Sequence, residues 1–116
     1  MTYYSYPGIP IKATEIVADI LQLPLENIKS KSRKTEIVKA RKIIMLTKHL
    51  SGNRIGQIAK EFELEHGTII YCLRTIKEDL QTNEHTRLIV AKVIARLNLS
   101  SEYNTYLQRI KKEFWL

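Results

Sequence analysis

The chain has 116 residues, 44% of them hydrophobic, which is enough for one compact core and too little for two. It has no run of the ~20 uncharged apolar residues that a membrane-spanning helix needs, and residues 1–10 lack the basic and apolar regions of a secretion signal. Its single cysteine excludes an intrachain disulfide, and its net charge of +7 favours a polyanionic partner. We therefore expect one cytoplasmic domain.

The first ten residues hold three tyrosines, two prolines and a glycine without helical spacing. We expect residues 1–10 to form an N-terminal arm, whose tyrosines either dock on the domain or stack on unpaired bases. From Thr14, a residue type that favours helix N-caps, apolar residues follow at helical spacing as far as Pro24. This pattern predicts a first amphipathic helix.

Positive charge is concentrated in residues 29–48, the basic segment, where Glu36 is the only acidic residue. Eight of the nineteen Lys and Arg residues lie there: Lys29, Lys31, Arg33, Lys34, Lys39, Arg41, Lys42 and Lys48. Such a cluster is either an electrostatic footprint for a polyanion or an ordinary solvated helix face.

The same segment carries a helical pattern. Apolar residues from Ile37 to Leu50 recur at intervals of three and four, which predicts the longest helix of the chain, ended by Ser51-Gly52. Arg41, Lys42 and Lys48 lie off the apolar stripe, and we expect them to face solvent or a ligand.

Two further helical patterns, over residues 55–62 and 69–80, are separated by the short connector Glu63-Leu64-Glu65. Two helices joined in this way are typical of a helix-turn-helix, whose second helix, the recognition helix, enters the major groove of DNA. The residues at its N-terminal end, which would meet the base edges, are Glu65, His66, Gly67, Thr68 and Tyr71.

These residue types suit contact with bases. Thr68 can bond a base edge or touch a thymine methyl, Glu65 can accept from a cytosine amino group, and Gly67 allows close approach of the backbone. His66 can donate to a phosphate or a base. The alternative is that Glu65 or His66 merely begins the helix, where a carboxylate is favoured by the exposed N–H groups.

Residues 88–97 and 103–114 repeat apolar side chains at helical spacing, and no period-two pattern occurs anywhere. The fold class is therefore expected to be all-α, a compact bundle of five to six helices. We divide the chain into the arm (1–10), a helix-turn-helix domain (11–99) and a C-terminal helix (100–116).

Signals of catalysis and of metal binding are lacking. The three histidines are dispersed without the spacing of a zinc site, and there is no phosphate-binding glycine loop. Cys72 lies on the apolar face of its predicted helix, where a small buried side chain is expected. We therefore expect no enzyme, no metal and no cofactor.

Three blocks occur in order: Ser30-Lys31-Ser32-Arg33, Ile37-Val38-Lys39-Ala40-Arg41-Lys42 and Glu65-His66-Gly67-Thr68-Ile69-Ile70. Over about residues 14–97 the chain resembles the C-terminal DNA-binding domain (domain IV) of the bacterial replication initiator DnaA, within the Trp-repressor-like helix-turn-helix superfamily. The resemblance implies that Arg33 enters the minor groove, that Arg41 contacts the DNA backbone and that Glu65 to Thr68 occupy the major-groove signature. It also implies a bacterial or phage source.

The chain departs from that family at the turn and the signature. Gly67 replaces a threonine, Glu65 an aspartate, and Glu63-Leu64 shortens a Gly-Gly-Arg stretch. Between residues 61 and 84 six acidic residues face only two cations, Arg74 and Lys77. We therefore expect altered or relaxed sequence specificity, with most binding energy coming from the basic segment.

The resulting hypothesis is a stand-alone module that binds double-stranded DNA and no membrane, acting as a replication-associated factor or a transcriptional regulator. The DNA-binding residues are predicted to be Lys31, Arg33, Lys34, Arg41, Lys42, Glu65, His66, Gly67, Thr68 and Tyr71. The alternative is a protein-interaction module that keeps the fold without specific DNA binding. It would use the aromatic end Phe114-Trp115-Leu116 as an anchor or dimerise through the C-terminal helix.

Overall fold

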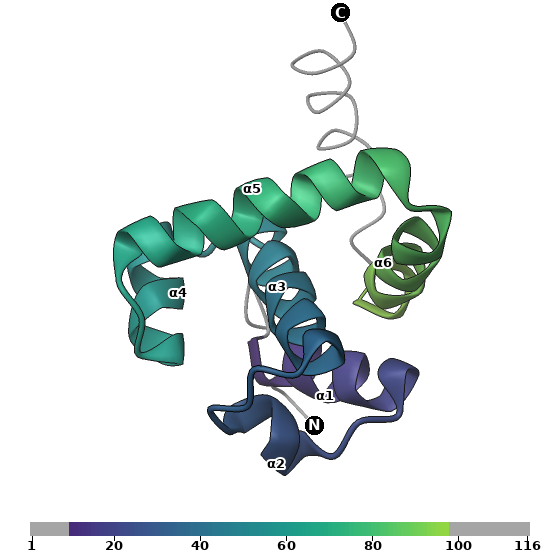
Figure 1. Cartoon of the computed structure of the whole chain (residues 1–116), viewed down its shortest axis with the longest axis horizontal. Coiled ribbons are helices and arrows are strands. Elements are labelled where there is room, and N and C mark those ends of the chain that lie inside the picture. Colours follow the sequence, from purple (N-terminus) through teal and green to yellow (C-terminus); the bar gives the residue numbers. More distant parts are fainter. Residues whose placement is uncertain (1–9, 98–116) are drawn as a thin grey trace, which may run out of the picture.

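A computed structural model describes residues 10–97 and shows six α-helices with no strand in that range (Figure 1). The helices are α1 (Pro10–Leu21), α2 (Leu25–Lys29), α3 (Thr35–Leu50), α4 (Ile55–Phe62), α5 (His66–Thr82) and α6 (Glu84–Leu97). The all-α class is thus confirmed. The N-terminal arm before Pro10, the predicted C-terminal helix and the aromatic end lie outside the described residues.

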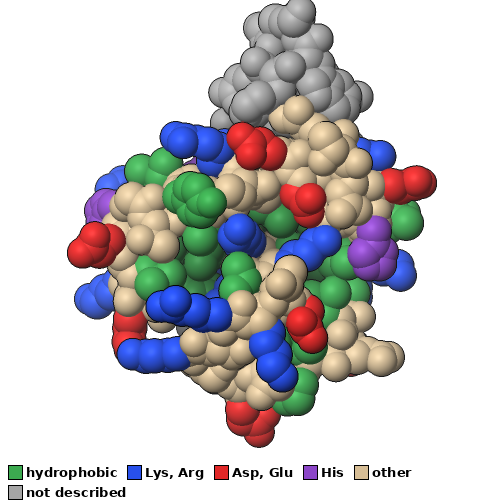
Figure 2. All heavy atoms as spheres, viewed as in Figure 1, with side chains coloured by type: hydrophobic (Ala, Val, Ile, Leu, Met, Phe, Trp, Pro, Cys, Tyr) green, Lys and Arg blue, Asp and Glu red, His purple; other side chains and the backbone are tan. Residues whose placement is uncertain are grey.

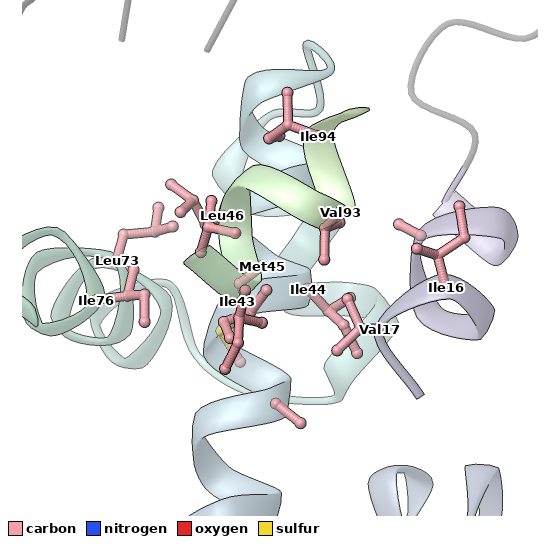
Figure 3. Close-up of a cluster of buried hydrophobic side chains, with 14 of the residues drawn as sticks. Ile16, Val17, Ile43, Ile44, Met45, Leu46, Leu73, Ile76, Val93 and Ile94 are labelled. Carbon is pink, nitrogen blue, oxygen red and sulfur yellow. The ribbon is translucent and has the colours of Figure 1, made fainter. Parts of the chain in front are cut away.

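Helix α3 is the centre of the bundle and packs against all five of the other helices. In Figure 1, α5 lies across one end of α3, with α4 and α6 beneath its two ends, while α1 and α2 lie at the opposite end of α3. Four consecutive α3 residues, Ile43 to Leu46, are each at most 2% exposed because neighbouring helices cover every side of this turn. Figure 3 shows them between Val17 of α1, Ile76 of α5 and Val93 of α6.

The first helix begins earlier than its sequence pattern predicted. Helix α1 begins at Pro10, so Thr14 lies inside the helix and is not its N-cap. Proline is favoured in the first turn of a helix, because its fixed φ is helical and its missing N–H would have had no partner there. A second difference is small: α5 has 17 residues and α3 has 16, so α3 is not the longest helix.

Lys48 is buried, and the prediction that it faces solvent or a ligand was wrong. Only 3% of this residue is exposed, because α4 covers the C-terminal turn of α3. Its Nζ lies 2.5 Å from Glu61 Oε1 and 5.5 Å from the centre of the Phe62 ring. Since Glu61 and Phe62 are the last residues of α4, this contact fixes the first helix of the predicted helix-turn-helix on α3.

A helix that crosses a membrane must be both long and apolar. None of the helices within residues 10–97 meets both conditions.

Candidate nucleic-acid interface

The turn between α4 and α5 has the three residues predicted for it, Glu63 to Glu65. Glu63 ends α4 in the left-handed conformation, with φ 55° and ψ 46°. The N–H of Leu64 then donates to Ala59 O at 2.9 Å, which satisfies a carbonyl of the last turn of α4. The helix-turn-helix geometry therefore forms although no glycine occupies the left-handed position.

The first three turns of α5 have a core face and a solvent face. Ile69, Leu73 and Ile76 are buried, whereas Gly67, Thr68 and Tyr71 are exposed. A side chain built at Gly67 would meet no atom within 4 Å, so this position opens directly to solvent. The five residues predicted to meet base edges are thus all exposed at this end of the helix: Glu65, His66, Gly67, Thr68 and Tyr71.

His66, the first residue of α5, is exposed but also lies against α4. A Cβ placed on Gly56 would be 3.4 Å from both Cε1 and Nε2 of the His66 ring. The absence of a side chain at Gly56 therefore allows the imidazole to approach the first turn of α4. That turn is itself closed by Gln57, whose Oε1 accepts the backbone N–H of Arg54 at 2.8 Å.

Lys42 connects the basic segment to the recognition helix. Its Nζ lies 5.8 Å from the centre of the Tyr71 ring, within reach of a cation–π interaction. Tyr71 is 60% exposed, so the pair lies at the surface. The structure thus brings two predicted site residues together although they are on different helices.

The loop between α2 and α3, residues 30–34, is here called the basic loop. Lys31, Arg33 and Lys34, three of the residues predicted to bind DNA, are exposed on it. Two serines shape its backbone: Ser30 Oγ accepts the N–H of Ser32 at 3.1 Å, and Ser32 Oγ accepts the N–H of Lys34 at 3.2 Å. The serines of the Ser-Lys-Ser-Arg block are therefore structural, and its cations point away.

Arg41 faces the basic loop from α3 and is half-buried. Its Nε donates to Ile28 O at 2.9 Å and its Nη1 to Ser32 O at 2.7 Å. Its Nη2 donates to Ser30 O and, at 3.4 Å, to Asn27 O. All three nitrogens of the guanidinium are thus directed at backbone carbonyls of the chain itself.

A recess of about 710 Å³ separates the basic loop from the turn of the helix-turn-helix. Lys31 and Arg33 line one side, Glu61 and Glu63 the other, and Ile28, Ile44 and Phe62 are among its apolar residues. In Figure 2, hydrophobic side chains gather on and below the left half of α5, with Lys and Arg side chains around them. The basic loop and the turn therefore border the same hollow.

The helix-turn-helix of the bacterial DnaA protein, as a family model, matches residues 11–76, which run from α1 into the second half of α5. The chain belongs to this family. It is 38% identical over 81 residues to the chromosomal replication initiator protein DnaA of Campylobacter concisus and 36% identical over 81 residues to that of Campylobacter curvus. The DnaA of Thermodesulfovibrio yellowstonii is 29% identical over 83 residues.

These alignments cover 68–70% of this chain but only 19% of each relative, so the chain spans about a fifth of the length of the DnaA proteins it matches. No solved structure matches it. The family match and the identities to DnaA proteins confirm the resemblance to DnaA that the three sequence blocks indicated.

Beyond the predicted residues, this DnaA-type domain exposes further polar side chains near the interface. Arg74 is exposed three residues after Tyr71, so it continues the same face of α5, and its helical spacing from Tyr71 was a usable signal. Arg54 and Gln57 are exposed at the start of α4. Nothing in their residue types distinguishes them from ordinary surface positions. They are identified only by the structure, in which His66 lies against the first turn of α4.

Cys72 lies between the interface and the core. It is half-buried, and burial raises the pKa of its thiol, an effect that the charge of Lys42 partly offsets. The thiol is therefore held in its neutral form. Among residues 10–97, no three His, Cys, Asp or Glu side chains form a group that could hold a metal ion.

Proposed function

We propose that this chain binds double-stranded DNA, with the basic loop at the minor groove and the N-terminal end of α5 in the major groove. The observation that carries this proposal is the common border of the two elements. Arg33 of the basic loop and Glu63 and Leu64 of the turn line one recess, while Lys42 bridges to Tyr71 of the recognition helix. A helix-turn-helix in this family provides the scaffold.

The structure also limits how many cations can reach phosphates. Lys48 is buried against Glu61, Lys39 pairs with Asp79 at 3.5 Å, and Arg41 is bonded to the loop carbonyls. The other five cations of the basic segment, Lys29, Lys31, Arg33, Lys34 and Lys42, keep accessible side chains. Five phosphate contacts correspond to a salt slope of about −4.5, so a fourfold rise in salt should weaken binding by roughly a few hundredfold.

Sequence specificity is proposed to be altered or relaxed relative to the family. Gly67 has no side chain to offer a base, and Glu63 and Glu65 place two carboxylates beside the groove-facing end of α5. A carboxylate repels phosphate but can accept a hydrogen bond from a cytosine amino group. Attachment would then depend on the basic loop, and discrimination among bases on a small number of contacts near Thr68.

As to its biological role, we propose a replication-associated factor or a transcriptional regulator. The relatives are named chromosomal replication initiators, but this chain corresponds to a fifth of their length. The shared part contains the helix-turn-helix, so either role would rest on DNA attachment.

Fluorescence anisotropy tests DNA binding with a random duplex, a duplex carrying the initiator's recognition box and a single strand, each across a salt series. We expect both duplexes to bind with the slope given above, and Arg33→Ala to weaken both. Lys92→Ala is the matched control, because it removes one exposed cation from α6 and should leave binding unchanged. No duplex binding at low salt would refute the proposal and favour a protein-interaction module.

A further inference from the structure

Arg41 stands out because its guanidinium is directed at the protein backbone. We propose that Arg41 is the positioning residue that holds the basic loop in the conformation in which Arg33 meets DNA, and that it makes no phosphate contact of its own. This inference rests on the proposed DNA binding. It assigns Arg41 a role different from the contact with the DNA backbone that its position in the family implies.

The hydrogen bonds explain why an arginine is needed. Four carbonyls spread over residues 27–32 converge on one planar group, and its three nitrogens supply donors in different directions. A lysine ammonium is a point charge on a flexible stem and cannot reach this set of acceptors from a single place. Arg41→Lys should therefore keep the positive charge but lose the hydrogen bonds that hold the conformation of the basic loop.

The serines complete the internal bonding of the loop. Ser30 and Ser32 give their carbonyls to Arg41 and take the N–H groups of Ser32 and Lys34 on their hydroxyls. Backbone N–H and carbonyl groups at Ser30, Ser32 and Lys34 are thus hydrogen-bonded within the protein, and these bonds order the loop before any ligand arrives. Ordering in advance removes an entropic cost from binding.

The position of Arg41 on α3 then relates the loop to the recognition helix. Its neighbours Ala40 and Ile44 are fully buried, so this turn of α3 is anchored in the core. The next residue, Lys42, contacts Tyr71 of α5. Consecutive residues of one rigid helix therefore serve the two DNA-facing elements, Arg41 the basic loop and Lys42 the recognition helix.

A double-mutant cycle separates positioning from direct contact. Arg41→Lys and Arg41→Ala should each weaken duplex binding about tenfold, as for the loss of one good groove contact. In an Arg33→Ala background, Arg41→Lys should change the dissociation constant less than about twofold, because it acts through Arg33. Near-wild-type binding by Arg41→Lys, or full additivity with Arg33→Ala, would overturn the proposal.

Amide hydrogen exchange provides a readout without DNA. In Arg41→Lys, exchange in residues 30–34 should accelerate at least tenfold while the buried amides of α5 keep their rates. Ser32→Ala, which removes one hydroxyl and leaves Arg41 in place, should produce a smaller change in the same residues. Unchanged loop exchange in Arg41→Lys would refute the positioning role. If the wild-type chain fails to bind duplex, the function proposal fails, and exchange still decides whether Arg41 orders the loop.

Discussion

Removing one charge of the Lys48–Glu61 pair should change the free energy of unfolding by an amount that depends on which partner is removed. The side chain of Lys48 is 4% exposed and that of Glu61 is 41% exposed, so the charge that remains is buried in one case and solvated in the other. Glu61→Gln leaves a buried ammonium without its counter-ion. Breaking a fully buried pair costs about 3–5 kcal/mol, and the exposure of Glu61 reduces this to about 1–3 kcal/mol. Lys48→Met keeps the apolar stem and leaves a solvated carboxylate, so its change should stay within about 1 kcal/mol.

Urea unfolding followed by far-ultraviolet circular dichroism measures both free energies of unfolding. A loss of about 1–3 kcal/mol in Glu61→Gln corresponds to a fall in melting temperature of roughly 5–20 °C for a domain of this size. Asp19→Asn is the control: it breaks the Arg96–Asp19 pair at 2.8 Å, whose side chains are 48% and 70% exposed. That change should cost at most about 0.5 kcal/mol. A Lys48→Met variant less stable than Glu61→Gln would refute the reasoning.

Three further predictions concern the turn and the recognition helix. Glu63→Gly should stabilise the fold by about 1 kcal/mol by relieving the left-handed φ of 55°, whereas Glu63→Ala removes the same charge without that gain, as paired unfolding curves would show. Gly67→Ala should stabilise α5 by about 0.5–1 kcal/mol, since its Cβ meets no atom within 4 Å, and Gly67→Thr should increase discrimination between duplexes measured by anisotropy. Burial raises the pKa of the Cys72 thiol, so its stabilising contribution is complete below the ordinary thiol pKa and falls as the pH rises through the raised value. Unfolding free energies of wild type and Cys72→Ala between pH 7 and pH 10 should therefore converge, and parallel curves would contradict this.

The helix-turn-helix could be predicted closely because its signals are local. The apolar spacing, the three-residue connector and the boundaries at Phe62 and His66 depend on residues within a few turns of one another. The start of α1 could not be predicted from Pro10, because proline is found both where helices end and in their first turn.

The sequence could not predict the environments of Lys48 and Arg41. Periodicity assumes a helix with one covered face, but residues 43–48 of α3 are buried in succession because several helices surround that end. The acceptors of Arg41 are main-chain carbonyls up to 14 residues away, and a carbonyl has no signature in the residue type that carries it. Both side chains therefore looked like surface cations.

Arg41 and Lys42 are consecutive residues of α3, and they contact the basic loop and α5, respectively. The separation between these two elements is therefore fixed by one helix. In the proposed mode of DNA binding, both elements are attached to α3, so the protein would set the distance between the minor-groove and the major-groove contact. Inserting one base pair between those contacts would shift one of them by about 3.4 Å along the duplex and rotate it by roughly 35°. The domain would then select duplexes by geometry at base pairs that no side chain touches.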